Sequence, residues 1–417
     1  MFNKKQKFVM ITLTLVILAL GIGIYMNKSL FFDKSTVPAN SSSYERIRNA
    51  TPSLSASLKW EQTFGGSKQE KLIDAFYING KLYVFGNTVS SDFDMNGIDC
   101  GFMAILTSNG STVNFLPISK TEIEAVCIAE GGFLLTTAYP SSQAMIVDFD
   151  GNVIKSLSLF STQEITKMLT FNDNGYSILS TSTSAGGKQI ITITLIDYNL
   201  NLIYQIVCNE NYSLYPLDMY CLGEQTIVFS HAQGADNRLC VTVFIKGKSP
   251  FNKYITLNES YTPYRVLPYN DGWVVCAIDH LSQAFLLKLS YSYALTQKFL
   301  FNISDCVSCD MRYSNNAYYV FANRNTGGFL AVVNEDISDS VIKTQSEKFS
   351  YYNDYKFLRA ISIENGVVMG IIKQNDITRV PLTSTLATKA MLVGEYLVYQ
   401  GDGYFGESDI TVCLVDA

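Results

Sequence analysis

One type of segment recurs along most of this chain, and it constrains the fold more than any other feature. Each copy is a turn rich in Asn, Gly or an acidic residue, followed by a very apolar strand of five or six residues. The copies are NGKLYVFG (79–86), EGGFLLTT (130–137), DNGYSILS (173–180), GEQTIVFS (223–230), NDGWVVCA (270–277), NNAYYVFA (315–322), ENGVVMGI (364–371) and GEYLVYQ (394–400). Most successive copies lie about 43–51 residues apart, and the last two only about 29 apart.

Alternating strands follow each of the first six copies. In QIITITLID (189–197), Ile191 and Ile193 fall on one face of a strand and Thr192 and Thr194 on the other. Aromatic residues make up 13% of the chain, mostly Tyr and Phe, which favours strands over helices. Four strands per unit at a fixed period are typical of a β-propeller, whereas a sandwich needs no fixed period. The sequence therefore predicts an all-β propeller over residues 58–417.

The two ends of the repeat region complement each other. The C-terminal stretch GEYLVYQGDGYFGESDITVCLVDA supplies inner strands without an outer strand, and SLKWEQTF (57–64) is an outer strand that stands before the first unit. We expect the N-terminal strand to complete the last blade, which closes the ring and removes an exposed edge. Eight inner-strand signals allow eight blades. The short last spacing leaves too little chain for a full four-stranded blade, so seven blades are favoured and one signal is assigned to an irregular blade.

A resemblance becomes visible over residues 58–112. The segments W-E-Q-T-F-G-G-S, LYVFGNTVSSDFD and CGFMAILTSNG are similar to bacterial cell-surface β-propeller repeats. Those repeats read Trp, Phe-Gly-Gly, then Tyr-Val-x-Gly-x-Thr-x-Ser-x-Asp-Phe. The middle blades lack the Trp and the Phe-Gly-Gly, so the resemblance implies a fold and a surface location. It carries over no catalytic residue.

The N-terminal residues differ from the rest. Lysines 4, 5 and 7 precede an uncharged apolar run at 8–26, whose helical length of about 28 Å matches the hydrocarbon core of a bilayer. The positive-inside rule keeps residues 1–7 in the cytoplasm. We predict an uncleaved transmembrane signal anchor at 8–26; a cleaved signal peptide is the alternative. Residues 27–57, rich in Ser, Asn, Thr and Pro, are predicted to be a flexible stalk. The propeller is then extracytoplasmic, on a single-pass membrane protein.

Charge and cysteine content exclude some functions. The formal net charge is −6 without a basic block, which argues against a nucleic-acid partner. The nine cysteines mostly fall in apolar strand-like runs and are interpreted as small buried hydrophobic residues. Cys306 and Cys309 form the one close pair. Residues three apart on a regular strand face opposite sides, so a metal or redox role would need a turn there.

One loop has the composition of a calcium site. In DFDMNGID, Asp92, Asp94 and Asn96 alternate, a glycine permits a sharp turn, and Asp99 adds another carboxylate. Oxygen ligands at positions 1, 3 and 5 match the first half of a calcium loop, but Met103 stands where the bidentate Glu is expected. The alternative is an acidic turn between two strands.

Other candidate residues are less specific. Adjacent or alternating acids, such as Glu122 with Glu124 and Glu335 with Asp336, carry no mark of an acid/base pair. The aromatic segments SYTPYRVLPYNDGW and KFSYYNDYKF would form a glycan- or protein-binding face or pack between blades. Arg265 and Arg359 lie near them and are candidates to anchor an acidic group.

These observations predict a binding or scaffolding module at the cell envelope with a protein or glycan ligand. The alternative is a polysaccharide hydrolase or lyase that uses the central face of the propeller. A sensor that signals through the membrane helix is a third hypothesis, and it needs a membrane partner because the cytoplasmic tail is only seven residues long.

Overall fold

The computed structural model contains only strands, turns and loops in the residues it describes. These residues are 57–64, 68–90, 100–110, 112–138, 140, 142–159, 165–172, 174–208, 211–234, 236–314, 316–345, 349, 353–355, 358–364, 367–373, 377–383, 386–393, 396–402 and 408–416. Among them, no helix is long and apolar enough to cross a membrane. The predicted anchor (8–26) and all but one residue of the predicted stalk (27–57) lie outside the described residues.

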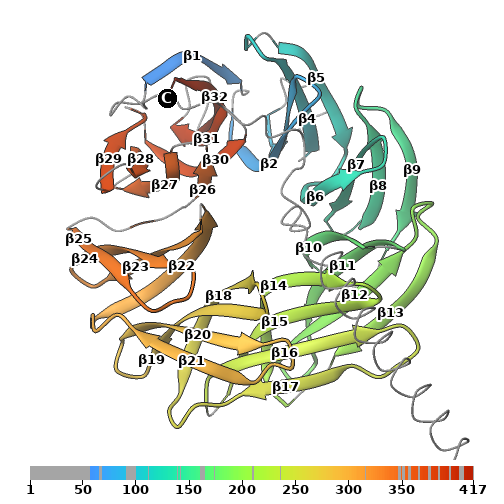
Figure 1. The fold of residues 1–417 in the computed structure, drawn as a ribbon. Coiled ribbons are helices and arrows are strands. Elements are labelled where there is room, and N and C mark those ends of the chain that lie inside the picture. Colours follow the sequence, from blue (N-terminus) through green and yellow to red (C-terminus); the bar gives the residue numbers. More distant parts are fainter. Residues whose placement is uncertain are drawn as a thin grey trace, which may run out of the picture. The chain divides into compact units, whose positions relative to one another are not determined.

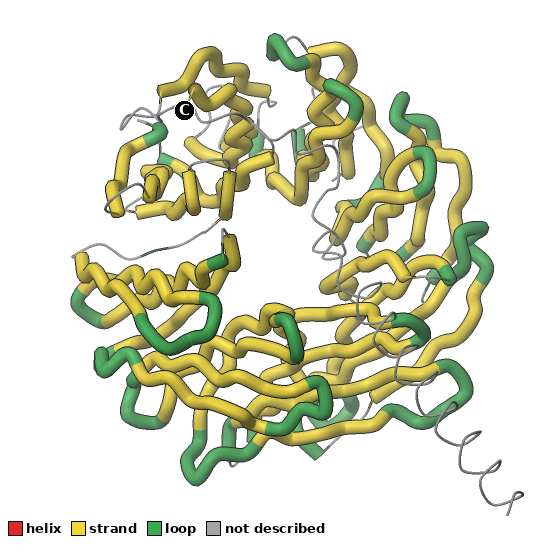
Figure 2. Tube along the Cα trace, viewed as in Figure 1, coloured by secondary structure: helices red, strands yellow, loops and turns green. Residues whose placement is uncertain are grey.

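Within residues 57–417, the strands form four-stranded antiparallel sheets arranged around a central opening (Figures 1 and 2). Blades 1 to 3 follow the chain in order. They contain β2 (Glu70–Ile78), β3 (Lys81–Thr88), β4 (Cys100–Thr107) and β5 (Thr112–Ser119); β6 (Ile123–Ala129), β7 (Gly132–Thr137), β8 (Gln143–Asp148) and β9 (Val153–Ser158); and β10 (Ile165–Asn172), β11 (Gly175–Thr183), β12 (Gln189–Ile196) and β13 (Leu202–Cys208).

Blades 4 to 6 repeat the same order, with the first strand innermost and the fourth outermost (Figure 1). They contain β14 (Ser213–Leu222), β15 (Gln225–Gln233), β16 (Arg238–Ile245) and β17 (Phe251–Ile255); β18 (Tyr261–Tyr269), β19 (Gly272–Asp279), β20 (Ala284–Ser290) and β21 (Leu295–Leu300); and β22 (Cys306–Ser314), β23 (Ala317–Arg324), β24 (Gly327–Asn334) and β25 (Ser340–Gln345).

Blade 8 joins the two ends of the described chain. It contains β30 (Ala387–Val393), β31 (Tyr396–Asp402), β32 (Ser408–Asp416) and, as its outermost strand, β1 (Ser57–Phe64). Trp60 pairs with Leu414 and Phe64 with Ile410 in the antiparallel ladder between β1 and β32. The prediction that the N-terminal strand completes the last blade is confirmed.

The remaining sheet, blade 7, is built differently. It contains β26 (Asn353–Tyr355), β27 (Leu358–Glu364), β28 (Val367–Lys373) and β29 (Ile377–Pro381). Glu364 at the end of β27 pairs with Val367 at the start of β28, so only two residues separate the two strands, as between the first two strands of every other blade. The short β26 is therefore an extra strand on the inner edge. Only residues 382–386 separate β29 from β30, and no described strand pairs with the outer edge of β29.

The described residues thus form seven regular blades and one irregular sheet, eight sheets in all. The sequence favoured seven blades, allowed eight, and assigned one inner-strand signal to an irregular blade; the preference for seven regular blades is confirmed. Blade 8 takes its outer strand from the N-terminal end, and no described strand lies outside β29 in blade 7. Two inner-strand signals therefore fit within a stretch of chain that is too short for two regular blades.

Apolar side chains pack mainly between neighbouring blades. The Trp273 side chain is 1% exposed, and its ring centroid lies 4.7 Å from that of Phe229 in the preceding blade. Tyr220 adds a third ring, 5.0 Å from Trp273. The aromatic segment around Trp273 was predicted either to form a binding face or to pack between blades. The Trp273 side chain packs between blades.

All nine cysteines are free thiols, and seven of them are buried. Cys306 and Cys309 lie in one apolar cluster between blades 5 and 6, together with Cys276. The expectation that a three-residue spacing places the pair on opposite faces is wrong, because the ladder shifts register between Cys306 and Ser308. This β-bulge adds one residue and returns both thiols to the same side.

Candidate functional site

The strand that comes directly before the repeated apolar strand of each blade contains a β-bulge; it is the innermost strand in every blade except blade 7, where β27 lies next to β26. The register shifts lie between Leu72 and Asp74, Ile123 and Ala125, Thr166 and Met168, Pro216 and Asp218, Pro263 and Arg265, Cys306 and Ser308, Leu358 and Ala360, and Ala387 and Lys389. Bulges bend a strand and change the direction of the side chains around them. The repeat therefore places a structurally equivalent group of side chains beside the opening in every blade.

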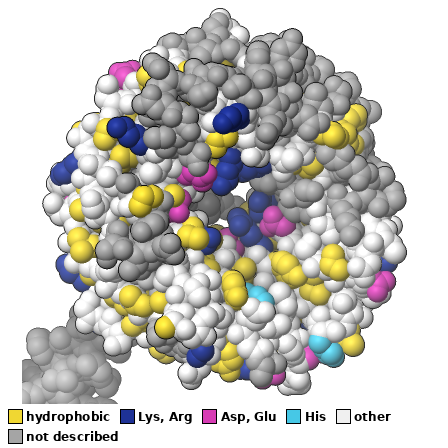
Figure 3. Space-filling model, turned by 180° about the vertical axis from the view of Figure 1, so that it is seen from behind, with side chains coloured by type: hydrophobic (Ala, Val, Ile, Leu, Met, Phe, Trp, Pro, Cys, Tyr) yellow, Lys and Arg dark blue, Asp and Glu magenta, His cyan; other side chains and the backbone are white. Residues whose placement is uncertain are grey.

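Charged residues occupy one of these equivalent positions in five blades. The position is the fourth residue before the end of the innermost strand, and its charged occupants, which we call the charged ring, are Asp74, Asp218, Arg265, Asp310 and Lys389. Figure 3 shows acidic and basic side chains gathered around the central opening. None of these residues is close to another in the sequence, so the ring is a product of the fold.

On one side of the ring, Arg265 of blade 5 lies between two carboxylates. Its Nη1 atom is 3.0 Å from Oδ1 of Asp218 in blade 4, and its Nε atom is 3.8 Å from Oδ1 of Asp310 in blade 6. Arg312 adds a second guanidinium, with Nη1 also 3.0 Å from Oδ1 of Asp310. These ion pairs connect three successive blades beside the opening.

Asp218 is the most buried acid of this network, with only 6% of its surface exposed. Its Oδ2 atom accepts a hydrogen bond of 2.7 Å from the backbone N–H of Val266 in the next blade. Burial raises the pKa of Asp218 to about 6, and the nearby Arg265 charge offsets only part of this effect. The carboxylate therefore stays ionised at neutral pH at a cost in desolvation.

A second interaction closes the seam between blades 8 and 1. Nζ of Lys389 donates hydrogen bonds to the backbone oxygens of Leu72, at 2.9 Å, and Ile73, at 2.6 Å. Burial raises the pKa of Asp74 to about 6, although the Ala75 N–H and the Lys389 charge act in the opposite direction. Burial also lowers the pKa of Lys389. At this seam, hydrogen bonds with nearby backbone groups hold both the Asp74 carboxylate and the Lys389 ammonium group.

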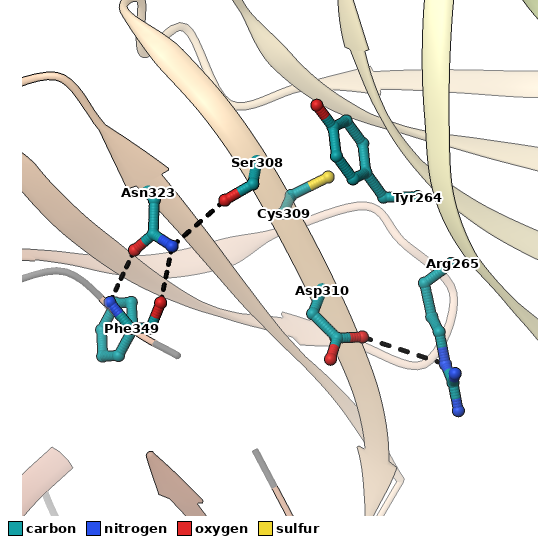
Figure 4. A pocket seen from close by; sticks show the side chains of 7 residues that line it. All are labelled: Tyr264, Arg265, Ser308, Cys309, Asp310, Asn323 and Phe349. Atoms are coloured by element: carbon teal, nitrogen blue, oxygen red, sulfur yellow. Dashed lines mark hydrogen bonds and ion pairs between the residues drawn. The ribbon is translucent and has the colours of Figure 1, made fainter. Parts of the chain in front are cut away.

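A small cavity lies between blades 5 and 6 (Figure 4). Its volume is about 290 Å³, and it is lined by Tyr264, Arg265, Ser308, Cys309, Asp310, Asn323 and Phe349. Charged, hydroxyl, amide, thiol and aromatic groups therefore meet in one place. Two residues of the charged ring form part of its wall.

Apolar side chains are exposed where the innermost strands begin. An even number of antiparallel strands per blade brings each new blade back to the same face, so these starting residues share one end of the opening. Ile165, Tyr215 and Leu386 are 50%, 40% and 51% exposed there. Lys71 and Glu122 form an exposed ion pair of 3.9 Å at the equivalent positions of blades 1 and 2. We call these five residues the channel mouth.

The predicted calcium ligands Asp92, Asp94, Asn96 and Asp99 all lie outside the described residues. In the part of the chain that the structure describes, no three His, Cys, Asp or Glu side chains come together as a metal site would require.

The other acidic and basic candidates have different outcomes. Arg265, a candidate anchor for an acidic group, is held by the protein's own carboxylates. The side chain of Arg359 is not described. Oε2 of Glu124 accepts a 2.7 Å hydrogen bond from the backbone N–H of Thr166, which ties blade 2 to blade 3.

Sequence reasoning missed Asp74, Asp218, Asp310 and Lys389. The available signal was their common distance from the turn that ends each innermost strand, namely four residues before it. A comparison of the repeats position by position, rather than a search for short motifs, would have brought these charges together.

The two raised pKa values predict a pH dependence of stability. A folded-state pKa of about 6 for Asp74 and Asp218 exceeds the unfolded value of about 4, so the folded state binds more protons between these values. The free energy of unfolding is then expected to rise as the pH falls from about 7 to 4, by about 2 kcal/mol per carboxyl. Urea unfolding of the wild type and of the Asp74→Asn, Asp218→Asn double variant tests this. In the double variant, the free energy of unfolding should no longer rise between pH 7 and pH 4. If it rises as steeply as in the wild type, Asp74 and Asp218 do not have raised pKa values.

No family model matches this sequence, and no curated protein matches it. Solved structures do resemble the fold. The Dos1 propeller aligns with a TM-score of 0.55 at 11% identity, over 86% of this chain and 95% of that one. The computationally designed Ika8 protein aligns with a TM-score of 0.55 at 12% identity, over 85% and 98%.

The C-terminal WD40 domain of Sif2 aligns with a TM-score of 0.52 at 8% identity, over 84% of this chain and 99% of that domain. At such low identities a likeness establishes architecture and says nothing of ligands. Together with the sheet order, these likenesses identify the chain as an all-β propeller protein.

Proposed function

We propose that this chain is a membrane-anchored extracytoplasmic β-propeller that acts as a binding or scaffolding module at the cell envelope. The observation that carries this proposal is the contrast between the charged ring and the channel mouth. Both basic side chains of the charged ring already interact with groups of the protein itself. Arg265 is held by two carboxylates, and Lys389 by two backbone oxygens. The channel mouth instead presents exposed apolar side chains around the opening.

Exposed apolar groups ringed by charge are the usual composition of a recognition surface. Ile165, Tyr215 and Leu386 come from three different blades, so a ligand that covers them would span the opening. The Lys71–Glu122 pair supplies a polar rim beside them. The ligand is a protein or a glycan of the cell envelope. Residues 8–26 would anchor the propeller at the membrane, close to this ligand.

A second candidate function, polysaccharide hydrolysis or elimination, is favoured by one observation. Asp74 and Asp218 both have a pKa of about 6, which suits a general acid near neutral pH. The two residues lie in blades 1 and 4, and each is held by a neighbouring backbone N–H. Loss of polysaccharide cleavage in the Asp74→Asn or Asp218→Asn variant would favour this function over binding alone.

Crosslinking in intact cells with a membrane-impermeant reagent tests the proposal on the full-length chain. The Ile165→Ser, Tyr215→Ser variant should reduce the capture of the dominant ligand about tenfold. Ile154→Ser is the matched control, because Ile154 is 61% exposed on outer strand β9, away from the opening. Equal capture by all three proteins would contradict the channel mouth as the binding surface. Capture only with a membrane-permeant reagent would contradict the extracytoplasmic location.

A further inference from the structure

The cavity between blades 5 and 6 has walls from several elements (Figure 4). Strand β18 contributes Tyr264 and Arg265, and strand β22 contributes Ser308 and Asp310. Phe349, which follows blade 6 along the chain, lies in the wall opposite Tyr264. The Phe349 ring is 2% exposed and packs against Phe321, so Tyr264 is the aromatic group that faces the cavity, beside the polar groups of Ser308 and Asp310.

One wall is fixed by hydrogen bonds that leave it little freedom. The side-chain amide of Asn323 accepts a bond of 2.6 Å from the backbone N–H of Phe349 and donates a bond of 2.6 Å to its backbone oxygen. The same amide nitrogen also donates to Oγ of Ser308, at 3.1 Å. A cavity whose walls are held in this way is preorganised, which lowers the entropic cost of binding.

Several polar groups in the cavity retain hydrogen-bonding capacity. Oδ1 of Asp310 accepts hydrogen bonds from the Met311 N–H and from Nη1 of Arg312, and lies 3.8 Å from Nε of Arg265. Oδ2 of Asp310 accepts no hydrogen bond from the described residues. Oγ of Ser308 accepts from Asn323, and no described residue accepts its hydroxyl hydrogen. The Tyr264 hydroxyl donates to the backbone oxygen of Val307, at 2.8 Å, and its oxygen can still accept. The cavity thus offers both acceptors and a donor.

The charge balance around the cavity selects against ions. Arg265 and Arg312 are matched by Asp218 and Asp310, so the formal charges of the network sum to zero. An anion would compete with the carboxylates that already face both guanidinium groups, and a cation would meet these same guanidinium groups. A neutral ligand that donates and accepts many hydrogen bonds fits best.

We infer that this cavity binds one neutral pyranose residue at the end of a glycan chain. Each sugar hydroxyl both donates and accepts, which suits Asp310 Oδ2 and the Ser308 hydroxyl, and the C–H face of the ring packs against Tyr264. A volume of about 290 Å³ is at the small end of ligand pockets, with room for one monosaccharide unit. The inference rests on the proposed binding function and assigns a glycan to it.

Saturation-transfer NMR on the full-length protein tests this inference with glucose, galactose, mannose and N-acetylglucosamine as probes. Glucuronic acid serves as the anionic counterpart. We expect at least one neutral sugar to bind with a millimolar or lower Kd. Ser308→Ala should weaken it several-fold and Asp310→Asn about tenfold. Asp236→Asn, at an exposed ion pair in blade 4, should leave the affinity unchanged.

Two results would overturn the inference. One is the absence of transfer to every neutral sugar, or equal transfer in all variants. The other is tighter binding of glucuronic acid than of any neutral sugar. Ser308→Ala also separates the two proposals, because it removes a hydroxyl without breaking the ion pairs. If crosslinked capture in cells persists while no sugar binds the purified protein, the cavity assignment fails and the binding function stands with a protein ligand.

Discussion

A chain that begins at Lys68 is expected to lose most of the folding free energy of a chain that begins at Ser57. The difference between the two chains is strand β1 and a short connection. This strand is the outermost strand of blade 8, and it pairs with β32 at seven positions from Ser57 to Phe64. Without it, the sheet that closes the ring has three strands and an open edge.

The size of the effect follows from what β1 covers. Its loss removes the backbone hydrogen bonds of the ladder, each worth about 0.5–1.5 kcal/mol, and a side-chain bond of 2.9 Å between Thr63 and Thr411. It also uncovers the edge of a strand whose Ile410, Val412 and Cys413 are fully buried. A loss of several kcal/mol is expected, against a total stability of about 5–15 kcal/mol for a typical domain.

Urea unfolding of the two truncated chains measures this difference directly. The chain that begins at Ser57 is the matched control, because it differs from the full chain only by residues outside the described part. Hydrogen exchange should locate the damage: β30 to β32 should lose protection first, and β14 to β17, on another part of the ring, should lose it last. Equal midpoints for the two chains would show that β1 does not close the ring.

Most of the architecture could be predicted because it is encoded in local patterns. The turn and apolar strand of each repeat mark β3, β7, β11, β15, β19, β23, β28 and β31. SLKWEQTF could be paired with the C-terminal strand because each end lacks what the other supplies. The number of blades was harder to predict. Blade 7 lacks an outer strand among the described residues, and blade 8 takes its outer strand from the other end of the chain, and both effects shorten the spacing.

The candidate site was largely beyond sequence reasoning. Asp218 and Arg265 are 47 residues apart, and each is a single charged residue within a strand. Their meeting depends on a bulge that shifts the register of each innermost strand, and a bulge leaves no reliable mark in the residues themselves. The same effect reversed the expectation for Cys306 and Cys309. Local pattern therefore predicts the blades, and register decides which side chains meet between them.

The Arg265→Ala variant is expected to be destabilised by about 2–4 kcal/mol at pH 8. Removing the guanidinium leaves Asp218 buried and ionised, with the Val266 N–H as its one remaining hydrogen-bond donor among the described residues, whereas Asp310 keeps Arg312. Breaking a buried ion pair by removing one partner typically costs 3–5 kcal/mol. A smaller loss is expected because the Arg265 side chain is 33% exposed to solvent. Lys71→Ala removes an exposed pair and should cost less than about 1 kcal/mol.

A double-mutant cycle distinguishes two causes of the destabilisation: the unpaired Asp218 charge and the loss of Arg265 packing between blades. If the buried Asp218 charge causes the loss, Asp218→Asn in the Arg265→Ala background should restore a large part of the stability, because the neutral amide needs no counter-charge. The loss should also shrink as the pH falls below the Asp218 pKa, which the substitution raises beyond its wild-type value of about 6. A loss that is the same at pH 5 and pH 8, and is not relieved by Asp218→Asn, would show that Arg265 contributes through packing between blades rather than through its charge.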